Sequence, residues 1–115
     1  MKGVYLLLIE VKKDIFIKVG KLGKVKFEKG NYIYVGSAQK NLEKRIERHF
    51  RKNKNKFWHI DYLLANKNVK IKEVFYEPAK KERECAIAQL ISEYAKPIEN
   101  FGSSDCKCKS HLFKI

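Results

Sequence analysis

The chain has 115 residues, a length at which one domain buries roughly two thirds of its unfolded surface on folding. Hydrophobic residues make up 44% of it and charged residues 34%, with only 6 Gly and 2 Pro, which excludes collagen-like, low-complexity and wholly disordered chains. The longest apolar run, residues 4–9, is too short to span a membrane, and no small-residue cleavage site accompanies it. We therefore expect a cytoplasmic protein with no membrane partner.

The charge is strongly positive and unevenly distributed. The net charge is +13, from 26 Lys and Arg against 13 Asp and Glu. Residues 40–56 carry eight basic side chains against two glutamates, whereas residues 84–115 carry four of each sign. A basic face that follows a phosphate backbone releases counterions on binding, so this pattern favours a nucleic acid partner. A lysine-rich surface typical of heat tolerance is the alternative. The candidate phosphate contacts are Lys40, Lys44, Arg48, Arg51 and Lys52.

The first 38 residues are predicted to form strands. Residues 4–9 are continuously apolar, which is typical of a strand buried on both faces. Shorter strands are predicted over residues 15–19, 25–28 and 32–35, separated by turns rich in Gly, Lys and Asp. Together these segments predict an antiparallel meander.

A helix is predicted from residue 42 to about Lys52, with Asn41 as its N-cap. Its buried stripe is expected to contain Leu42, Ile46, His49 and Phe50. Arg45 precedes His49 by four residues, so the two side chains can be neighbours on the helix surface.

The second half continues the alternation of helices and strands. A short helix is predicted over residues 57–64, a strand over 69–76 and a long helix after Pro78, to about Ala95. An irregular stretch, 100–109, and a short apolar stretch, 112–115, follow. The core stripe of the long helix is expected to contain Ile87, Leu90, Ile91 and Tyr94. Glu84 lies at the inward edge of this helix, where an acid needs a partner. The pattern predicts one α/β domain of the α+β type, residues 1–115, with a central, mostly antiparallel sheet flanked by helices.

Several motifs carry a family resemblance. Gly3-Val4-Tyr5 and Tyr34-Val35-Gly36 resemble the paired strand motifs of the GIY-YIG nuclease superfamily, with Val in place of Ile in both. The segment from Leu42 to His49 is similar to the L-x-x-R-x-x-x-H helix of that superfamily. The run from Glu84 to a Pro-x-x-Asn ending is also similar, and the match spans residues 3–100. The chain thus resembles a GIY-YIG domain over most of its length.

A narrower resemblance covers three further segments. YVGSA at residues 34–38, WHIDYLL at 58–64 and FGSSDCKCKSHLF at 101–113 resemble an uncharacterised archaeal branch of the superfamily. Members of that branch occur alone or fused to endonuclease III-like glycosylases, which implies a repair glycosylase as a partner.

The superfamily resemblance implies a metal-dependent endonuclease that hydrolyses phosphodiester bonds in DNA, in repair or recombination. Glu84 would hold one Mg²⁺ or Mn²⁺ ion through oxygen, the ligand atom that these ions prefer. Arg45 would grip the scissile phosphate with its planar guanidinium. Tyr5 would act as the general base, with its phenol pKa lowered by a nearby cation. Tyr34 and His49 would orient water or assist proton movement, and Asn100 would support Glu84 or the phosphate.

Two rival functions remain open. The domain could be a non-catalytic nucleic-acid-binding module of the same fold, or a structural domain whose positive charge is incidental. Trp58 is expected to anchor the core rather than to stack on an unpaired base. His59 and Asp61 are two positions apart on a helix and are expected to point in different directions.

The chain departs from the superfamily pattern between the two tripeptides. Relatives usually join these motifs by one short turn, whereas 28 residues separate Tyr5 from Tyr34 here. The additional hairpin, residues 15–28, could narrow access to the site, recognise a substrate or displace Tyr5.

Three cysteines are an odd number, which disfavours a secreted disulfide scaffold and fits a reducing compartment. Cys106, Cys108 and His111, together with Cys85, offer the sulfur and nitrogen donors of a tetrahedral Zn²⁺ site. Isolated thiols are the favoured interpretation. The zinc site and a disulfide from Cys85 to Cys106 or Cys108 are the alternatives.

Overall fold

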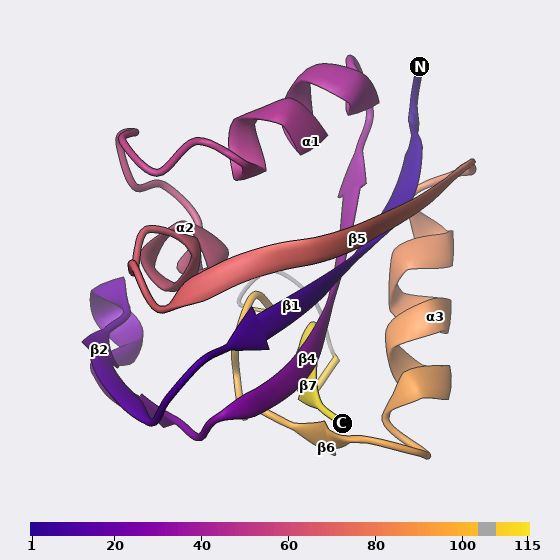
Figure 1. The fold of residues 1–115 in the computed structure, drawn as a ribbon. Coiled ribbons are helices and arrows are strands. Elements are labelled where there is room, and N and C mark those ends of the chain that lie inside the picture. Colours follow the sequence, from indigo (N-terminus) through magenta and orange to yellow (C-terminus); the bar gives the residue numbers. More distant parts are fainter. Residues whose placement is uncertain (104–107) are drawn as a thin grey trace.

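The computed structural model describes residues 1–103 and 108–115, and it has the predicted α+β architecture (Figure 1). The central antiparallel sheet has the strand order β5-β1-β4-β7-β6, with β1 (Gly3–Val11), β4 (Gly30–Ala38), β5 (Val69–Pro78), β6 (Lys96–Pro97) and β7 (Leu112–Lys114). The helices are α1 (Leu42–His49), α2 (His59–Leu64) and α3 (Glu82–Ile91). Each strand pair of the sheet is antiparallel, which confirms the predicted fold class.

The predicted meander is wrong in its pairing. β1 pairs directly with β4, with Tyr5 opposite Gly36 and Leu7 opposite Tyr34. The inserted segment forms its own two-stranded sheet from β2 (Ile15–Lys18) and β3 (Lys24–Phe27), which a 3-10 turn joins. This hairpin packs against α2, so Tyr5 and Tyr34 keep neighbouring places on adjacent strands despite the insertion.

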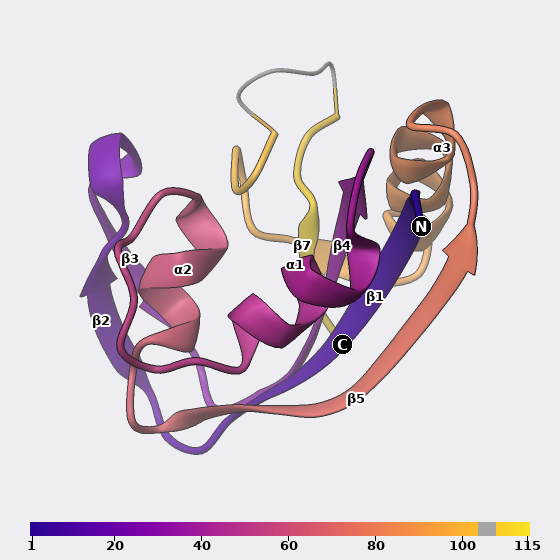
Figure 2. The same ribbon diagram turned by 90° about the horizontal axis from the view of Figure 1, so that it is seen from above.

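The two central strands are covered on both faces, as the continuous apolar run of β1 predicts. Tyr5, Leu7 and Ile9 alternate with Leu6 and so point to one face, where they pack in the large core beneath α1 and α2. Leu6 points to the other face, where α3 packs (Figure 2). The helices therefore cover both faces of the sheet, with α1 and α2 on one face and α3 on the other.

Both long helices are shorter than predicted. α1 ends at His49, and Phe50, expected in the buried stripe, is 55% exposed. Asn41 occupies the N-cap position as predicted, and its carbonyl accepts the N–H of Arg45, but its backbone is left-handed and its side chain makes no capping bond. The short helix begins at His59 rather than at residue 57. No described helix is long and apolar enough to cross a membrane.

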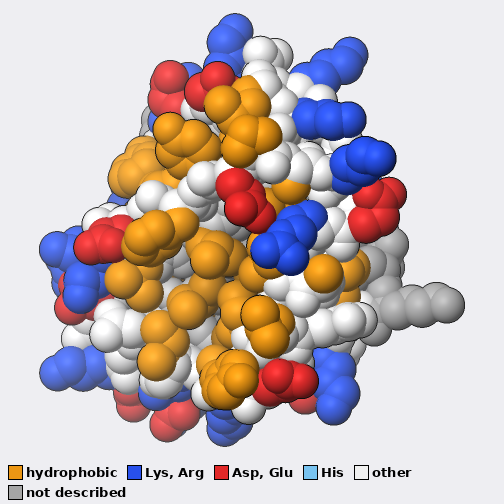
Figure 3. Space-filling view, turned by 90° about the vertical axis from the view of Figure 1, so that its right-hand side faces the viewer, with side chains coloured by type: hydrophobic (Ala, Val, Ile, Leu, Met, Phe, Trp, Pro, Cys, Tyr) orange, Lys and Arg blue, Asp and Glu red, His pale blue; other side chains and the backbone are white. Residues whose placement is uncertain are grey.

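The predicted core stripe of α3 is wrong in two of its four positions. Leu90 and Tyr94 are exposed, and the helix ends at Ile91. Ala88 is buried instead, in a second, smaller core cluster with Val35 and Phe113. Its small side chain lets the helix approach this cluster closely. Hydrophobic side chains gather on the outer face of the molecule on the side of α3 and β5 (Figure 3).

Candidate functional site

A cavity of about 690 Å³ opens where one end of β1 and β4 meets α1, the start of α3 and the segment before β7. Its lining brings together four residues that the superfamily resemblance assigns to one site: Tyr5, Tyr34, Arg45 and Glu84. Lys40, a predicted phosphate contact, lies on the same wall. The hairpin contributes nothing to the described lining, so it does not narrow access to this cavity.

The lining also contains residues without a predicted catalytic or phosphate-binding role. These are Gly36, Ser37, Gln39, Phe57, Trp58, His59, Lys81, Gly102 and His111. Phe57 and Lys81 are exposed and carry no motif of their own, so only the fold places them at the cavity.

The position of Glu84 depends on where β7 stops. α3 packs mainly on the face of the sheet opposite α1, which would separate Glu84 from Arg45. Among the described residues, however, β7 pairs with β4 only up to Tyr34, and the N–H of Val35 donates to the carbonyl of His111, so residues 36–38 of β4 have no backbone partner on that side. Glu84, in the first turn of α3, lines the same cavity as Arg45.

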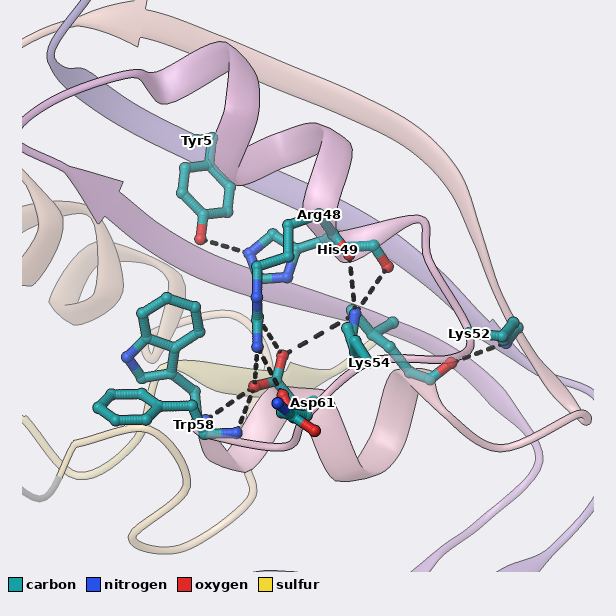
Figure 4. Close-up of polar contacts among 10 residues, drawn as sticks. Tyr5, Arg48, His49, Lys52, Lys54, Trp58 and Asp61 are labelled. Atoms are coloured by element: carbon teal, nitrogen blue, oxygen red, sulfur yellow. Dashed lines mark hydrogen bonds and ion pairs between the residues drawn. The ribbon is translucent and has the colours of Figure 1, made fainter.

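Tyr5, which lines the cavity, forms a buried pair with His49, which is not among the lining residues. A 2.6 Å hydrogen bond joins the Tyr5 hydroxyl to Nε2 of His49 (Figure 4). Burial raises the pKa of Tyr5 well above its ordinary value, and the charge of Arg45 opposes this only in part. The expectation of a lowered phenol pKa is therefore wrong. Burial also raises the pKa of Tyr34, with Tyr5 itself as the next cause, so both phenols are neutral at pH 7.

His49 is neutral for the same reason. Burial, followed by the charge of Lys54, lowers its pKa to about 3. Its other ring nitrogen, Nδ1, is buried, and the described part of the chain offers it no hydrogen-bond partner. Among the described residues, the hydrogen bond to Tyr5 is therefore the one that the imidazole ring makes.

Gly36 makes room for this arrangement. It lies opposite Tyr5 in the register of β1 and β4, and a Cβ atom there would overlap the phenol ring and its oxygen. The glycine of the second tripeptide therefore has a steric explanation that does not involve chemistry.

Arg45 is held at the cavity wall by two contacts. Its Nη1 donates to the carbonyl of Ser37 over 3.0 Å, and its Cζ lies 4.3 Å from the ring centroid of Trp58. A guanidinium has five N–H donors, so the bond to Ser37 leaves others for an anion. Trp58 packs against the core as predicted, but its partly buried ring also forms a platform for Arg45.

Two of the five predicted phosphate contacts are bound within the protein (Figure 4). Arg48 forms a bidentate ion pair with the fully buried Asp61, over 2.7 and 3.0 Å. Nζ of Lys52 donates to three backbone carbonyls, those of Leu64, Asn66 and Val69. Arg48 thereby connects α1, and Lys52 the residues that follow α1, to the segment from α2 to β5.

The other three predicted phosphate contacts, Lys40, Lys44 and Arg51, are exposed. Arg51 forms an exposed ion pair with Glu47 over 3.3 Å. The expectation that His59 and Asp61 point in different directions is confirmed, because Nδ1 of His59 accepts the N–H of Gly102 while Asp61 binds Arg48.

The described part of the C-terminal segment places its predicted residues differently. Asn100 is exposed, has a left-handed backbone (φ 62°) and is not among the residues that line the cavity. His111 is buried and lines the cavity, with Nδ1 3.8 Å from Oε2 of Glu84. Cys85 and Cys108 are in the thiol form, and Cys106 lies outside the described residues.

The carboxylate of Glu84 fits the ion that the superfamily implies. Its side chain is only 15% exposed but faces the cavity, and carboxylate oxygen is a ligand that Mg²⁺ and Mn²⁺ prefer. One carboxylate is sufficient where a substrate phosphate and water complete the coordination.

A family model described as a domain of unknown function, DUF123, matches residues 4–115. No curated protein and no solved structure matches the chain. The matched range includes all four predicted site residues that line the cavity.

Proposed function

The chain belongs to the DUF123 family, a GIY-YIG-like family, and on that premise we propose that it is a metal-dependent endonuclease that hydrolyses phosphodiester bonds in DNA. One observation carries the proposal. The guanidinium of Arg45 and the carboxylate of Glu84, which lie far apart in the sequence, share one open cavity with the hydroxyl-bearing rings of Tyr5 and Tyr34.

The charges at the cavity suit a phosphodiester. Its described lining contains three cationic side chains, Lys40, Arg45 and Lys81, and one acidic side chain, Glu84. Lys40 and Lys81 are exposed at the mouth, whereas Arg45 is partly buried. An anionic backbone that crosses the mouth would thus meet solvated lysines first and the guanidinium deeper in the cavity.

Arg45 is the group we assign to the scissile phosphate. The bond to Ser37 and the ring of Trp58 hold its guanidinium in one orientation before substrate binds. A donor fixed in advance stabilises the negative charge that develops at phosphorus without the cost of reorganisation. A planar guanidinium can bind two phosphate oxygens at once, so it stabilises this charge more strongly than a flexible surface lysine does.

Glu84 is the group we assign to the metal ion. A divalent ion supplies positive charge to the phosphoryl oxygens and lowers the pKa of a bound water. The part of this chain is to place an oxygen ligand in the cavity that also holds Arg45. Asn100 has no part in the proposal, because it does not line that cavity.

Tyr5 and His49 are assigned to proton movement. We place the attacking water beside the Tyr5 oxygen, which takes its proton while the phenol proton passes to Nε2 of His49 along the 2.6 Å hydrogen bond. This relay needs no phenolate, so it is compatible with the raised pKa of Tyr5. Burial, followed by the charge of Lys54, opposes the imidazolium that forms, and the charge of Asp61 favours it.

A non-catalytic nucleic-acid-binding module is the second candidate, and the same pKa directions favour it. Both phenols are neutral and His49 is a weak base in the free protein, so none is prepared for proton abstraction. The basic charge and the cavity would serve binding equally well.

The finer assignment to the archaeal branch is also part of the proposal. The segments at residues 34–38, 58–64 and 101–113 support it, and fusion of that branch to glycosylases supports a repair glycosylase as the partner. Repair or recombination of DNA in the cytoplasm would then be the setting.

The test is cleavage of duplex, forked and single-stranded DNA in Mg²⁺ or Mn²⁺ by wild type, Arg45→Ala and Arg83→Ala. Arg83 is the matched control, because it is an exposed arginine that pairs with Glu77, does not line the cavity and is not a predicted phosphate contact. We expect Arg45→Ala to cleave about 100-fold more slowly and Arg83→Ala to cleave nearly as the wild type does. Salt-dependent binding without cleavage by the wild type would instead establish the binding module.

A further inference from the structure

Three soft or borderline metal ligands meet next to the cavity. The ligand atoms of Cys85, Cys108 and His111 all lie within 4.8 Å of one another. Cys85 comes from α3, while Cys108 and His111 come from the segment that leads into β7. The cluster therefore joins two elements that are distant in the sequence.

The chemistry of this set differs from that of the Glu84 site. Two thiols and an imidazole are ligands that Zn²⁺ takes in tetrahedral sites, whereas Mg²⁺ and Mn²⁺ prefer oxygen. In such a site the ligand atoms lie about 3.5–3.8 Å apart, given Zn–S and Zn–N distances of about 2.3 and 2.0 Å. Ligand atoms that already lie within 4.8 Å need a shift of only about 1 Å to reach that geometry.

Burial favours a bound ion over exposed, reactive thiols. His111 is 2% exposed, and both cysteines are partly buried. A disulfide between Cys85 and Cys108 would not use the imidazole, whereas a zinc site gives it a role. The carboxylate of Glu84, whose Oε2 lies 3.8 Å from Nδ1 of His111, is also near enough to help fix the orientation of the imidazole ring.

We propose that Cys85, Cys108 and His111 bind one Zn²⁺ ion, with water in the fourth position. The ion fastens the first half of α3 to the segment before β7. The apolar cluster around α3 has three buried members, Val35, Ala88 and Phe113, while Ile87, Ile91 and Cys108 are only partly buried in it. Zinc would thereby hold α3, and with it Glu84, at the edge of the cavity.

The test uses the reduced, full-length protein, with Co²⁺ as a spectroscopic substitute for Zn²⁺. We expect one equivalent of Co²⁺ to produce the thiolate-to-cobalt charge-transfer absorption and one equivalent of Zn²⁺ to abolish it. Cys85→Ser and Cys108→Ser should each weaken zinc affinity at least about tenfold and reduce the absorption. Gln89→Ala, an exposed change one turn after Cys85 on the same helix, should do neither.

The charge-transfer band reports sulfur ligands alone, so an ion at Glu84 cannot produce it. The absence of an equimolar band in the reduced protein would overturn the proposal. A full band in Cys85→Ser would also overturn it, because the metal would then be held by other thiols. Thermal unfolding in a chelator tests whether the serine variants still fold. Both variants should have the melting temperature of the metal-free wild type. A much lower melting temperature for both would show that the cysteines stabilise the fold without metal, and it would overturn their assignment as metal ligands only.

Discussion

Replacement of Asp61 by Asn is expected to destabilise the protein strongly and to disturb the wall of the cavity. Asp61 is fully buried and accepts hydrogen bonds from Arg48 and from the backbone N–H groups of Phe57 and Trp58. Burial alone would raise the pKa of this carboxyl, but the bonds from Arg48 and the two N–H groups lower it below its ordinary value. Asp61 is therefore ionised at neutral pH, and its charge is compensated within the protein.

The expected cost follows from what the substitution leaves behind. The neutral amide of Asn offers one oxygen acceptor where the carboxylate offered two, and the partly buried guanidinium of Arg48 loses its counter-ion. Breaking a buried ion pair by removing one partner typically costs about 3–5 kcal/mol. Because Arg48 is 25% exposed on its side chain, solvent compensates part of its charge, and we expect about 3 kcal/mol.

Urea unfolding measures this cost as a change in the midpoint at constant slope. Glu47→Gln is the matched control: it removes the exposed partner of Arg51 on the same helix, and we expect no measurable change. The double variant Arg48→Met/Asp61→Leu should recover only part of the lost stability, because the nearly buried Lys54 and the N–H groups of Phe57 and Trp58 still lose Asp61 as their partner. Equal midpoints for Asp61→Asn and Glu47→Gln would refute the reasoning.

Three further predictions concern the cavity. Gly36→Ala should lower the free energy of unfolding by about 1–3 kcal/mol in thermal or urea unfolding, because its Cβ would overlap Tyr5; unchanged stability would contradict this steric argument. Stability should fall on acidification from pH 6.5 toward pH 3, by at most about 1.4 kcal/mol per pH unit, because the unfolded chain protonates His49 at its ordinary value of 6.5 while the folded protein does so only near 3. An equally steep fall in His49→Gln would count against that assignment. Phe57→Ala should weaken binding of single-stranded DNA by about 1–3 kcal/mol in a fluorescence titration and leave the melting temperature unchanged, because this 79% exposed ring lines the cavity and can stack on a base. Undiminished affinity would show that no base stacks there.

Local patterns predicted most of the elements but not how the strands pair. The apolar run of β1 and the turn residues after it indicated strands correctly, yet sequence adjacency suggested a meander. Pairing of β1 with β4 depends on long-range packing of Tyr5 and Leu7 against the same core, which no short window contains. The inserted hairpin is stable beside the sheet because it packs against α2.

Helical periodicity overestimated the buried faces for a related reason. Leu90 and Tyr94 have the spacing of a core stripe, but α3 approaches the sheet through Ala88. A small residue gives little signal in a hydrophobic pattern even where it sets the closest contact. Phe50 is exposed because α1 ends one residue before it.

For the site, the motifs predicted which residues are involved but not their burial or their partners. The motifs brought Tyr5, Tyr34, Arg45 and Glu84 to attention, and the structure places all four at one cavity. Charge counting could not tell which cations are bound within the protein, since the internal acceptors of Arg48 and Lys52 come from segments that follow them in the sequence. The pKa of Tyr5 likewise depends on burial, which outweighs the effect of Arg45.

The central claim is that the carboxylate of Glu84 acts in the same reaction centre as Arg45. Single-turnover cleavage of a labelled DNA substrate in Mn²⁺ tests it most directly, with Glu84→Gln compared with Glu82→Gln. Glu82 lies on the same turn of α3 but is exposed and does not line the cavity. We predict that Glu84→Gln binds the DNA yet cleaves it at least about 100-fold more slowly, while Glu82→Gln cleaves at the wild-type rate. Equal cleavage rates for the two variants would contradict the claim.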